Sequence, residues 1–90
     1  MNSTWRRKKL ESLQDGVWRA DGSIKLDKIM RLTGIRLPCG DYDTLAGMIL
    51  SRLKTVPERG TVLMLSESSV ELTVESLAGC LPGQVIIRKI

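Results

Sequence analysis

Histidine is absent from the 90-residue sequence. The chain therefore lacks the commonest general base near neutral pH, and Ser-His-Asp and Cys-His catalysis are excluded. The usual nitrogen ligand of transition metals is missing as well. We predict that the chain is not an enzyme, and no residue is assigned a catalytic role.

Cysteine is scarce, with Cys39 and Cys80 as the two examples. They are too few and too far apart in sequence to form a zinc motif. Two interpretations remain open, a disulfide between them or two small buried hydrophobic residues. The second is favoured because free cysteine is commonly buried.

Long apolar runs are also missing, since no segment approaches the roughly 20 residues that cross a bilayer. A composition of 42% hydrophobic and 27% charged residues is typical of a soluble globular domain. Ninety residues fit one domain. The sequence has no glycine loop of the P-loop or Rossmann kind. We expect one soluble, cytoplasmic domain.

The net charge of +4 can be attributed to one short segment of the chain. Four of the 14 basic residues form the run Arg6, Arg7, Lys8 and Lys9, and the other ten equal the acidic residues in number. This run could contact phosphates or anionic lipid heads, but a solvated linker is favoured. We therefore predict that residues 1–14 are a linker or N-terminal flank and that residues 15–90 form the domain.

The first half of this domain predicts a strand, a turn and a helix. Residues 17–20 alternate as a strand does, and Asp21-Gly22 is typical of a two-residue hairpin turn. The spacing of Leu26, Ile29, Met30 and Thr33 predicts one face of a helix. Gly34 is expected to end that helix in a left-handed conformation, with Ile35 packing back onto it.

A second helix is predicted over residues 41–53. Asp41 or Asp43 is expected to cap it, because a carboxylate accepts the amide protons that a first turn leaves unpaired. Gly47 costs roughly 1 kcal/mol relative to alanine within a helix, so we expect another backbone to approach closely there. Val56-Pro57 should end the helix.

The last third of the chain predicts strands. Residues 62–65 are apolar, residues 70–75 alternate between apolar and polar, and Leu81-Pro82-Gly83 is expected to connect to a final strand over residues 85–90. The predicted fold is α+β, with two helices packed on one side of a small antiparallel sheet.

One block of residues resembles a known family. The block runs Asp41-Tyr42-Asp43-Thr44-Leu45-Ala46-Gly47 and is followed by Pro57-Glu58 and Gly60. With Asp15-Gly16, Trp18 and Gly22 before it, it is similar to the transporter-associated domain of the CorC/HlyC family. The resemblance covers about residues 15 to 90.

The resemblance implies a regulatory or interaction domain at the cytoplasmic face of a membrane ion transporter. Such proteins carry a transmembrane region and paired CBS domains, and they are linked to magnesium and cobalt efflux and to hemolysins. The expected partners are the CBS and transmembrane domains of the parent protein, or a second copy, and no nucleic acid. The fold is similar to a subdomain of PCMH-type flavoproteins, which implies FAD or adenine-nucleotide binding as the alternative function.

Three acidic residues form a candidate cation site. Asp41, Asp43 and Glu58 could supply the oxygen ligands that Mg²⁺ or Ca²⁺ prefers. Helix capping by Asp41 and Asp43, with Thr44 supporting the same turn and Tyr42 beside it, is favoured over this hypothesis. No metal ligand or cofactor-binding residue is therefore assigned.

Overall fold

The structure, a computed structural model, describes residues 9–38 and 40–90. These residues form five strands and two helices. In chain order they are β1 (Leu10–Gln14), β2 (Val17–Asp21), α1 (Leu26–Thr33), α2 (Leu45–Leu53), β3 (Val62–Leu65), β4 (Val70–Ala78) and β5 (Leu81–Lys89).

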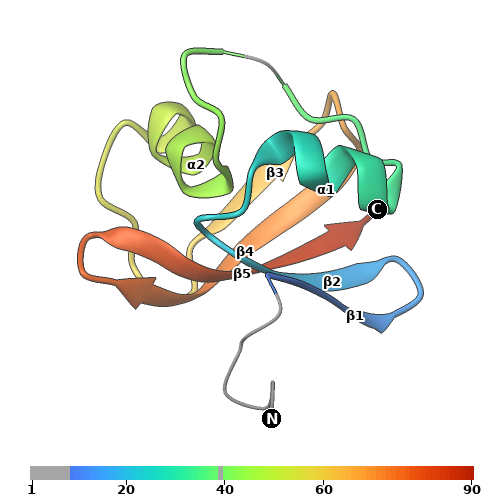
Figure 1. Cartoon of the computed structure of the whole chain (residues 1–90). Helices are drawn as coiled ribbons and strands as arrows, with labels where there is room; N and C mark the ends of the chain where they lie inside the picture. Colours follow the sequence, from blue (N-terminus) through green and yellow to red (C-terminus); the bar gives the residue numbers. More distant parts are fainter. Residues whose placement is uncertain (1–8, 39) are drawn as a thin grey trace, which may run out of the picture.

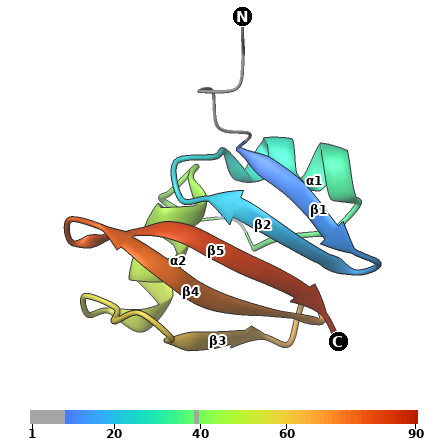
Figure 2. The ribbon, with the colours of Figure 1, turned by 90° about the horizontal axis from the view of Figure 1, so that it is seen from below.

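The five strands form one antiparallel sheet in the order β1-β2-β5-β4-β3. Both helices lie on the same face of this sheet (Figure 1). The opposite face is not covered by either helix (Figure 2). The predicted α+β architecture is confirmed. Neither α1 nor α2 has the length and apolar character that crossing a bilayer requires.

The core lies between the helices and the sheet. Alternate residues of β4 and β5 face it, and the helices contribute the apolar stripes that their spacing predicts. Its fully buried large side chains are Ile24, Ile29, Leu45, Met48, Ile49, Leu65, Val70, Leu72, Val74, Val85 and Ile87. No polar side chain of the described residues is buried with them.

The end of α1 is formed as predicted. Gly34 adopts a left-handed conformation with φ of 77°, and its N–H donates to the Met30 carbonyl at 2.9 Å. Ile35, just beyond it, is buried in the core. The glycine is required here because other residues resist positive φ.

The start of the domain differs from the prediction. Leu10–Gln14, predicted as part of a linker, form β1 and pair with β2. The hairpin turn is Asp15-Gly16, whereas Asp21-Gly22 leads from the end of β2 toward α1. The reason is that β1 is an edge strand with mostly exposed side chains, so it shows no alternating hydrophobic pattern.

The hairpin between β4 and β5 is also longer than predicted. Leu81-Pro82-Gly83 do not connect two elements but form the start of β5, which ends at Lys89. Pro82 lies opposite Leu77, next to two register shifts in β4. Irregular pairing tolerates a residue that has no N–H to donate, which explains how proline fits within this strand.

Candidate functional site

The family-like block lies where α2 begins. Its Thr44 is the N-cap of α2, and the Thr44 hydroxyl accepts a hydrogen bond from the Gly47 N–H at 3.1 Å. The prediction that Asp41 or Asp43 caps the helix is therefore wrong. Both carboxylates lie on exposed residues before the cap, whereas threonine at the N-cap itself reaches the amide three residues on.

The remaining amides of the first turn of α2 are also used. The Leu45 N–H donates to the Ile24 carbonyl at 2.9 Å, and the Ala46 N–H donates to the Gly22 carbonyl at 2.9 Å. A helix N-terminus binds phosphate through amides that are otherwise unpaired. At α2 these amides instead join the helix to the segment between β2 and α1.

Residues on both sides of the cap hold the two helices together. The Asp43 carbonyl accepts a hydrogen bond from the Leu26 N–H at 2.9 Å, at the start of α1. Leu45 and Ala46 are buried, and Tyr42 packs against the core while partly exposed. The block therefore connects the start of α1, the start of α2 and the segment that follows β2 through backbone hydrogen bonds.

The close approach expected at Gly47 comes from its own loop and not from another backbone. A Cβ added to Gly47 would lie 3.2 Å from the Tyr42 Cβ and 3.2 Å from the Thr44 Oγ1. Sequence reasoning missed the tighter position, Gly22, where an added Cβ would lie 2.0 Å from the Pro82 carbonyl oxygen. The sequence predicts a turn at Gly22. Its contact is with Pro82, which is distant along the chain, so no local sequence pattern indicates it.

The second part of the motif forms the turn before β3. Pro57 is buried, and the Glu58 N–H donates to the Thr61 Oγ1 at 3.0 Å. Gly60 has φ of 93°, and its N–H donates to the Val74 carbonyl at 2.7 Å. This turn therefore attaches the start of β3 to β4.

The candidate cation ligands do not form a metal site in the part of the chain that the structure describes. Asp41, Asp43 and Glu58 are all exposed. Within residues 9–38 and 40–90, no three histidine, cysteine or carboxylate side chains lie in an arrangement that could hold a metal ion. Asp41 and Asp43 belong to the loop before α2, whereas Glu58 belongs to the turn after it.

A cleft lies beside the start of α2. It has a volume of about 420 Å³ and is bounded by Thr44 and Ala46, by Gly22 and by the tip of the β4–β5 hairpin. A smaller cleft of about 270 Å³ lies on the other side of the motif, against Tyr42 and Asp43. The motif thus forms one wall of two neighbouring clefts.

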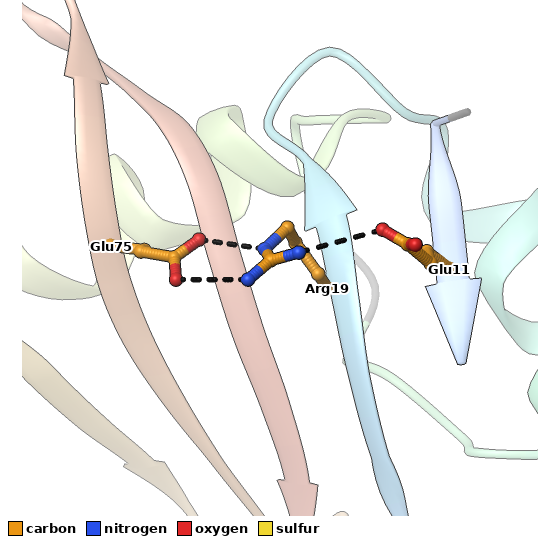
Figure 3. Close-up of polar contacts among 3 residues, drawn as sticks. All are labelled: Glu11, Arg19 and Glu75. Atoms are coloured by element: carbon orange, nitrogen blue, oxygen red, sulfur yellow. Dashed lines mark hydrogen bonds and ion pairs between the residues drawn. The ribbon is translucent and has the colours of Figure 1, made fainter. Parts of the chain in front are cut away.

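The open face of the sheet carries an ion-pair network (Figure 3). The Arg19 Nε–H donates to Glu75 Oε1 at 2.8 Å, across β5, and Arg19 Nη1 lies 3.5 Å from Glu11 Oε1. The hydrogen bond to Glu75, more than any other contact, raises the pKa of Arg19. Arg19 therefore connects β2 with β4 and with β1 on the face away from the helices.

The remaining sequence predictions fall partly outside the described residues. Arg6, Arg7, Lys8 and Cys39 lie there, so the structure does not bear on them. Lys9 is exposed and donates to the Ser23 Oγ at 3.0 Å. Cys80 is exposed in the turn between β4 and β5, which corrects its interpretation as a buried hydrophobic residue.

Replacing Thr44 with alanine is expected to lower the free energy of unfolding by about 1 kcal/mol, because the Gly47 N–H loses its side-chain acceptor. Asp43→Asn is expected to change the free energy of unfolding by no more than about 0.5 kcal/mol, because the Asp43 carboxylate does not cap the helix. Chemical denaturation measures both values. A larger loss for Asp43→Asn than for Thr44→Ala would contradict this assignment of the cap.

Comparison with known proteins finds a matching family model and a curated relative. A family model described as the transporter associated domain, CorC_HlyC, matches residues 11–90. A UPF0053 protein of Mycobacterium tuberculosis (strain CDC 1551 / Oshkosh) is 35% identical over 49 residues, which are 54% of this chain and 11% of that protein. The chain therefore spans a small part of this curated relative.

Solved structures share the fold. The transporter associated domain CorC_HlyC from Nitrosomonas europaea superposes with a TM-score of 0.83 at 23% identity, covering 94% of this chain and 100% of that chain. A region associated with a proposed Mg²⁺ and Co²⁺ transporter, CorC, from Neisseria meningitidis MC58 gives a TM-score of 0.80 at 16% identity, covering 92% and 100%. At these identities, the similarity establishes the fold.

Proposed function

Because the chain belongs to the CorC_HlyC transporter-associated domain family, we propose that it is a regulatory, protein-binding module at the cytoplasmic face of a larger membrane ion transporter. The observation behind this proposal is the family match over residues 11–90. The matched segment is only 11% of the M. tuberculosis relative. A domain of this kind thus occurs as a small part of a longer protein.

The geometry of the motif supports a binding module more than a catalytic one. Thr44 caps a helix, Leu45 is buried, and the amides of Leu45 and Ala46 bond to other backbone groups. Thr44, Leu45 and the backbone of Ala46 therefore build the domain and are not directed at a substrate. The amides that could hold a nucleotide phosphate at α2 are already used, so FAD gains no support from this helix.

The substrate class in the proposal is divalent cations. The region from N. meningitidis that shares this fold is named for association with a transporter of Mg²⁺ and Co²⁺. In our proposal the transported ion crosses elsewhere in the parent protein. This domain changes the rate of transport through its contacts with the other cytoplasmic parts, with the CBS domains as the expected partner.

Deletion of the domain from the full-length parent protein tests the proposal. Export of Mg²⁺ and Co²⁺ is measured in cells or vesicles, and the amount of protein inserted in the membrane is quantified alongside. We expect export to change while insertion stays the same. A matched control carries Leu32→Ala, a substitution on the exposed side of α1 that should leave export unchanged.

Two results would contradict the proposal. Export that is the same with and without the domain would show that it has no regulatory role. Loss of the inserted protein would show that the domain acts in assembly of the parent and not in regulation of transport.

A further inference from the structure

The outer side of α1 carries adjacent basic residues. Leu26 and Ile29 are buried in the core, whereas Lys28 and Arg31 lie on the opposite side of the helix and are exposed. Residues three apart are neighbours on a helix surface, so these two cations lie next to each other. Like charges at such spacing destabilise a helix slightly. Stability of α1 therefore does not explain this pair.

Two further cations lie at the ends of the helix. Lys25 is the N-cap of α1, and Arg36 follows its C-terminal glycine by two residues. Each lies between two neighbours that are buried in the core and is itself exposed. Their side chains therefore point away from the core. Lys25, Lys28, Arg31 and Arg36 together form the basic surface around α1.

Positive charge is concentrated on this part of the domain. Residues 25–36 contain these four cations and a single acidic residue, Asp27. The other described residues include seven basic and nine acidic ones. Lys9 adds a cation near the start of α1, because its Nζ donates to the Ser23 Oγ at 3.0 Å. The domain therefore has a positive side at α1 and a negative remainder.

The cations around α1 differ from those on the open face of the sheet, which have carboxylate neighbours. On the sheet, Arg19 contacts Glu75 and Glu11 (Figure 3). Arg88 lies opposite Glu71 where β4 pairs with β5. Within the part of the chain that the structure describes, no ion pair involves the basic surface around α1. Its charges are therefore available to an external anion.

We propose that the basic surface around α1 lies against an anionic phospholipid bilayer, with the open face of the sheet turned away from it. The choice of a bilayer rests on the proposed function, which puts the domain beside the negatively charged cytoplasmic leaflet. Each basic residue near such a surface strengthens binding by about fivefold. Four cations give a modest affinity. That is sufficient for a domain attached to a membrane protein, because attachment raises its effective concentration at the bilayer.

The described aromatic residues favour lipid over nucleic acid as the partner. Proteins that bind single-stranded nucleic acid stack the bases on aromatic side chains. Among the described residues, the aromatic ones are Trp18 and Tyr42, and both pack against the core and are only partly exposed. The basic surface thus offers charge, which phospholipid head groups require, without an exposed aromatic ring for a base.

Co-sedimentation with lipid vesicles tests the proposal. Vesicles of phosphatidylcholine mixed with phosphatidylglycerol are compared with vesicles of phosphatidylcholine alone. The 90-residue chain carries Arg6→Ser, Arg7→Ser and Lys8→Ser, so that its N-terminal basic run does not contribute. We expect binding to the anionic vesicles alone, weakening as salt is raised to physiological strength. Equal binding to both kinds of vesicle, or none to the anionic ones, would overturn the proposal.

Neutral substitutions locate the contact. In the same chain, Lys28→Gln with Arg31→Gln should weaken binding by about 25-fold, because two cations are lost. The matched control, Arg59→Gln with Arg88→Gln, removes equal charge from exposed residues of other segments and should stay within about twofold. Thermal unfolding confirms that both variants are folded. Equal weakening by the two pairs would show that net charge, and not the surface around α1, attracts the chain to lipid.

Removal of the single acidic residue among these cations should have the opposite effect. Asp27→Asn is expected to strengthen binding to the anionic vesicles by about fivefold. Glu58→Gln makes the same change of charge on an exposed residue in the turn before β3 and should stay within about twofold. Unchanged or weaker binding for Asp27→Asn would contradict the proposed orientation.

Two comparisons separate this inference from its alternatives. A DNA duplex is added to the chain in the same buffer, and binding to DNA at lower concentrations than to anionic vesicles would make nucleic acid the partner and refute a lipid contact. Vesicle binding is measured on the domain itself, whereas the regulatory role is tested by deletion in the parent protein. A domain that binds vesicles while its deletion leaves export unchanged would refute the regulatory role and keep the lipid contact.

Discussion

Replacing Gly22 with alanine is expected to lower the free energy of unfolding by about 3 kcal/mol or more, at the upper end of what overpacking costs. The added Cβ would lie 2.0 Å from the carbonyl oxygen and 3.0 Å from the carbonyl carbon of Pro82. Those atoms belong to the backbone of β5, so no side-chain rotation relieves the clash. The free energy of unfolding of such a small domain is on the order of 5 kcal/mol, so the expected loss is more than half of it.

The clash also disrupts a point where three elements meet. The Gly22 N–H donates to the Gly83 carbonyl at 2.8 Å, and the Gly22 carbonyl accepts from the Ala46 N–H at the start of α2. Moving Gly22 away from Pro82 lengthens these bonds. We expect the thermal midpoint to fall by about 12 °C or more.

Gly79→Ala is the matched control for this prediction. Gly79 has φ of 65° and no atom within 4 Å of an added Cβ, so alanine there meets backbone strain without a clash. That strain costs roughly 1–2 kcal/mol. Thermal unfolding measured for both variants separates the two effects. An equal or smaller loss for Gly22→Ala would show that β5 can move away from it.

Replacing Leu45 with alanine is expected to lower the free energy of unfolding by about 2–5 kcal/mol. Leu45 is the first residue of α2 and is fully buried in the core. Alanine would leave a cavity beneath the start of the helix, at the joint with the segment between β2 and α1. Chemical denaturation followed by circular dichroism measures the loss.

Leu32→Ala is the control, since the same change is made on a residue that is 63% exposed on α1. Leu32→Ala should change the free energy of unfolding by no more than about 0.5 kcal/mol. A result in which Leu45→Ala retains full stability would show that the motif leucine does not hold the domain together. The motif would then have to be explained by a contact with a partner.

The sequence was sufficient for features that depend on neighbouring residues. The apolar spacing from Leu26 to Thr33 predicts α1, because a helix repeats every 3.6 residues regardless of what covers it. Gly34 predicts the end of that helix from the steric freedom of glycine alone. The alternation over residues 70–75 likewise predicts β4, which has one face on the core.

Prediction of the candidate site was weaker because capping depends on the exact position where a helix begins. Asp41, Asp43 and Thr44 are all good N-cap residues. The choice of Thr44 follows from the hydrogen bonds that tie Asp43 and Leu45 to Leu26 and Ile24. Those bonds join segments about 20 residues apart in the chain, so no local pattern contains them.

The sequence by itself determined the helices, the central strands, the family and the absence of histidine chemistry, since each follows from residue types and their spacing. Only the tertiary structure decided that Leu10–Gln14 pair with β2, that Pro82 lies within β5, and that Gly22 contacts Pro82. It also decided that β3 is an edge whose Val62 and Met64 remain exposed. These features depend on which strands become neighbours, and strand order is set by packing of the whole core.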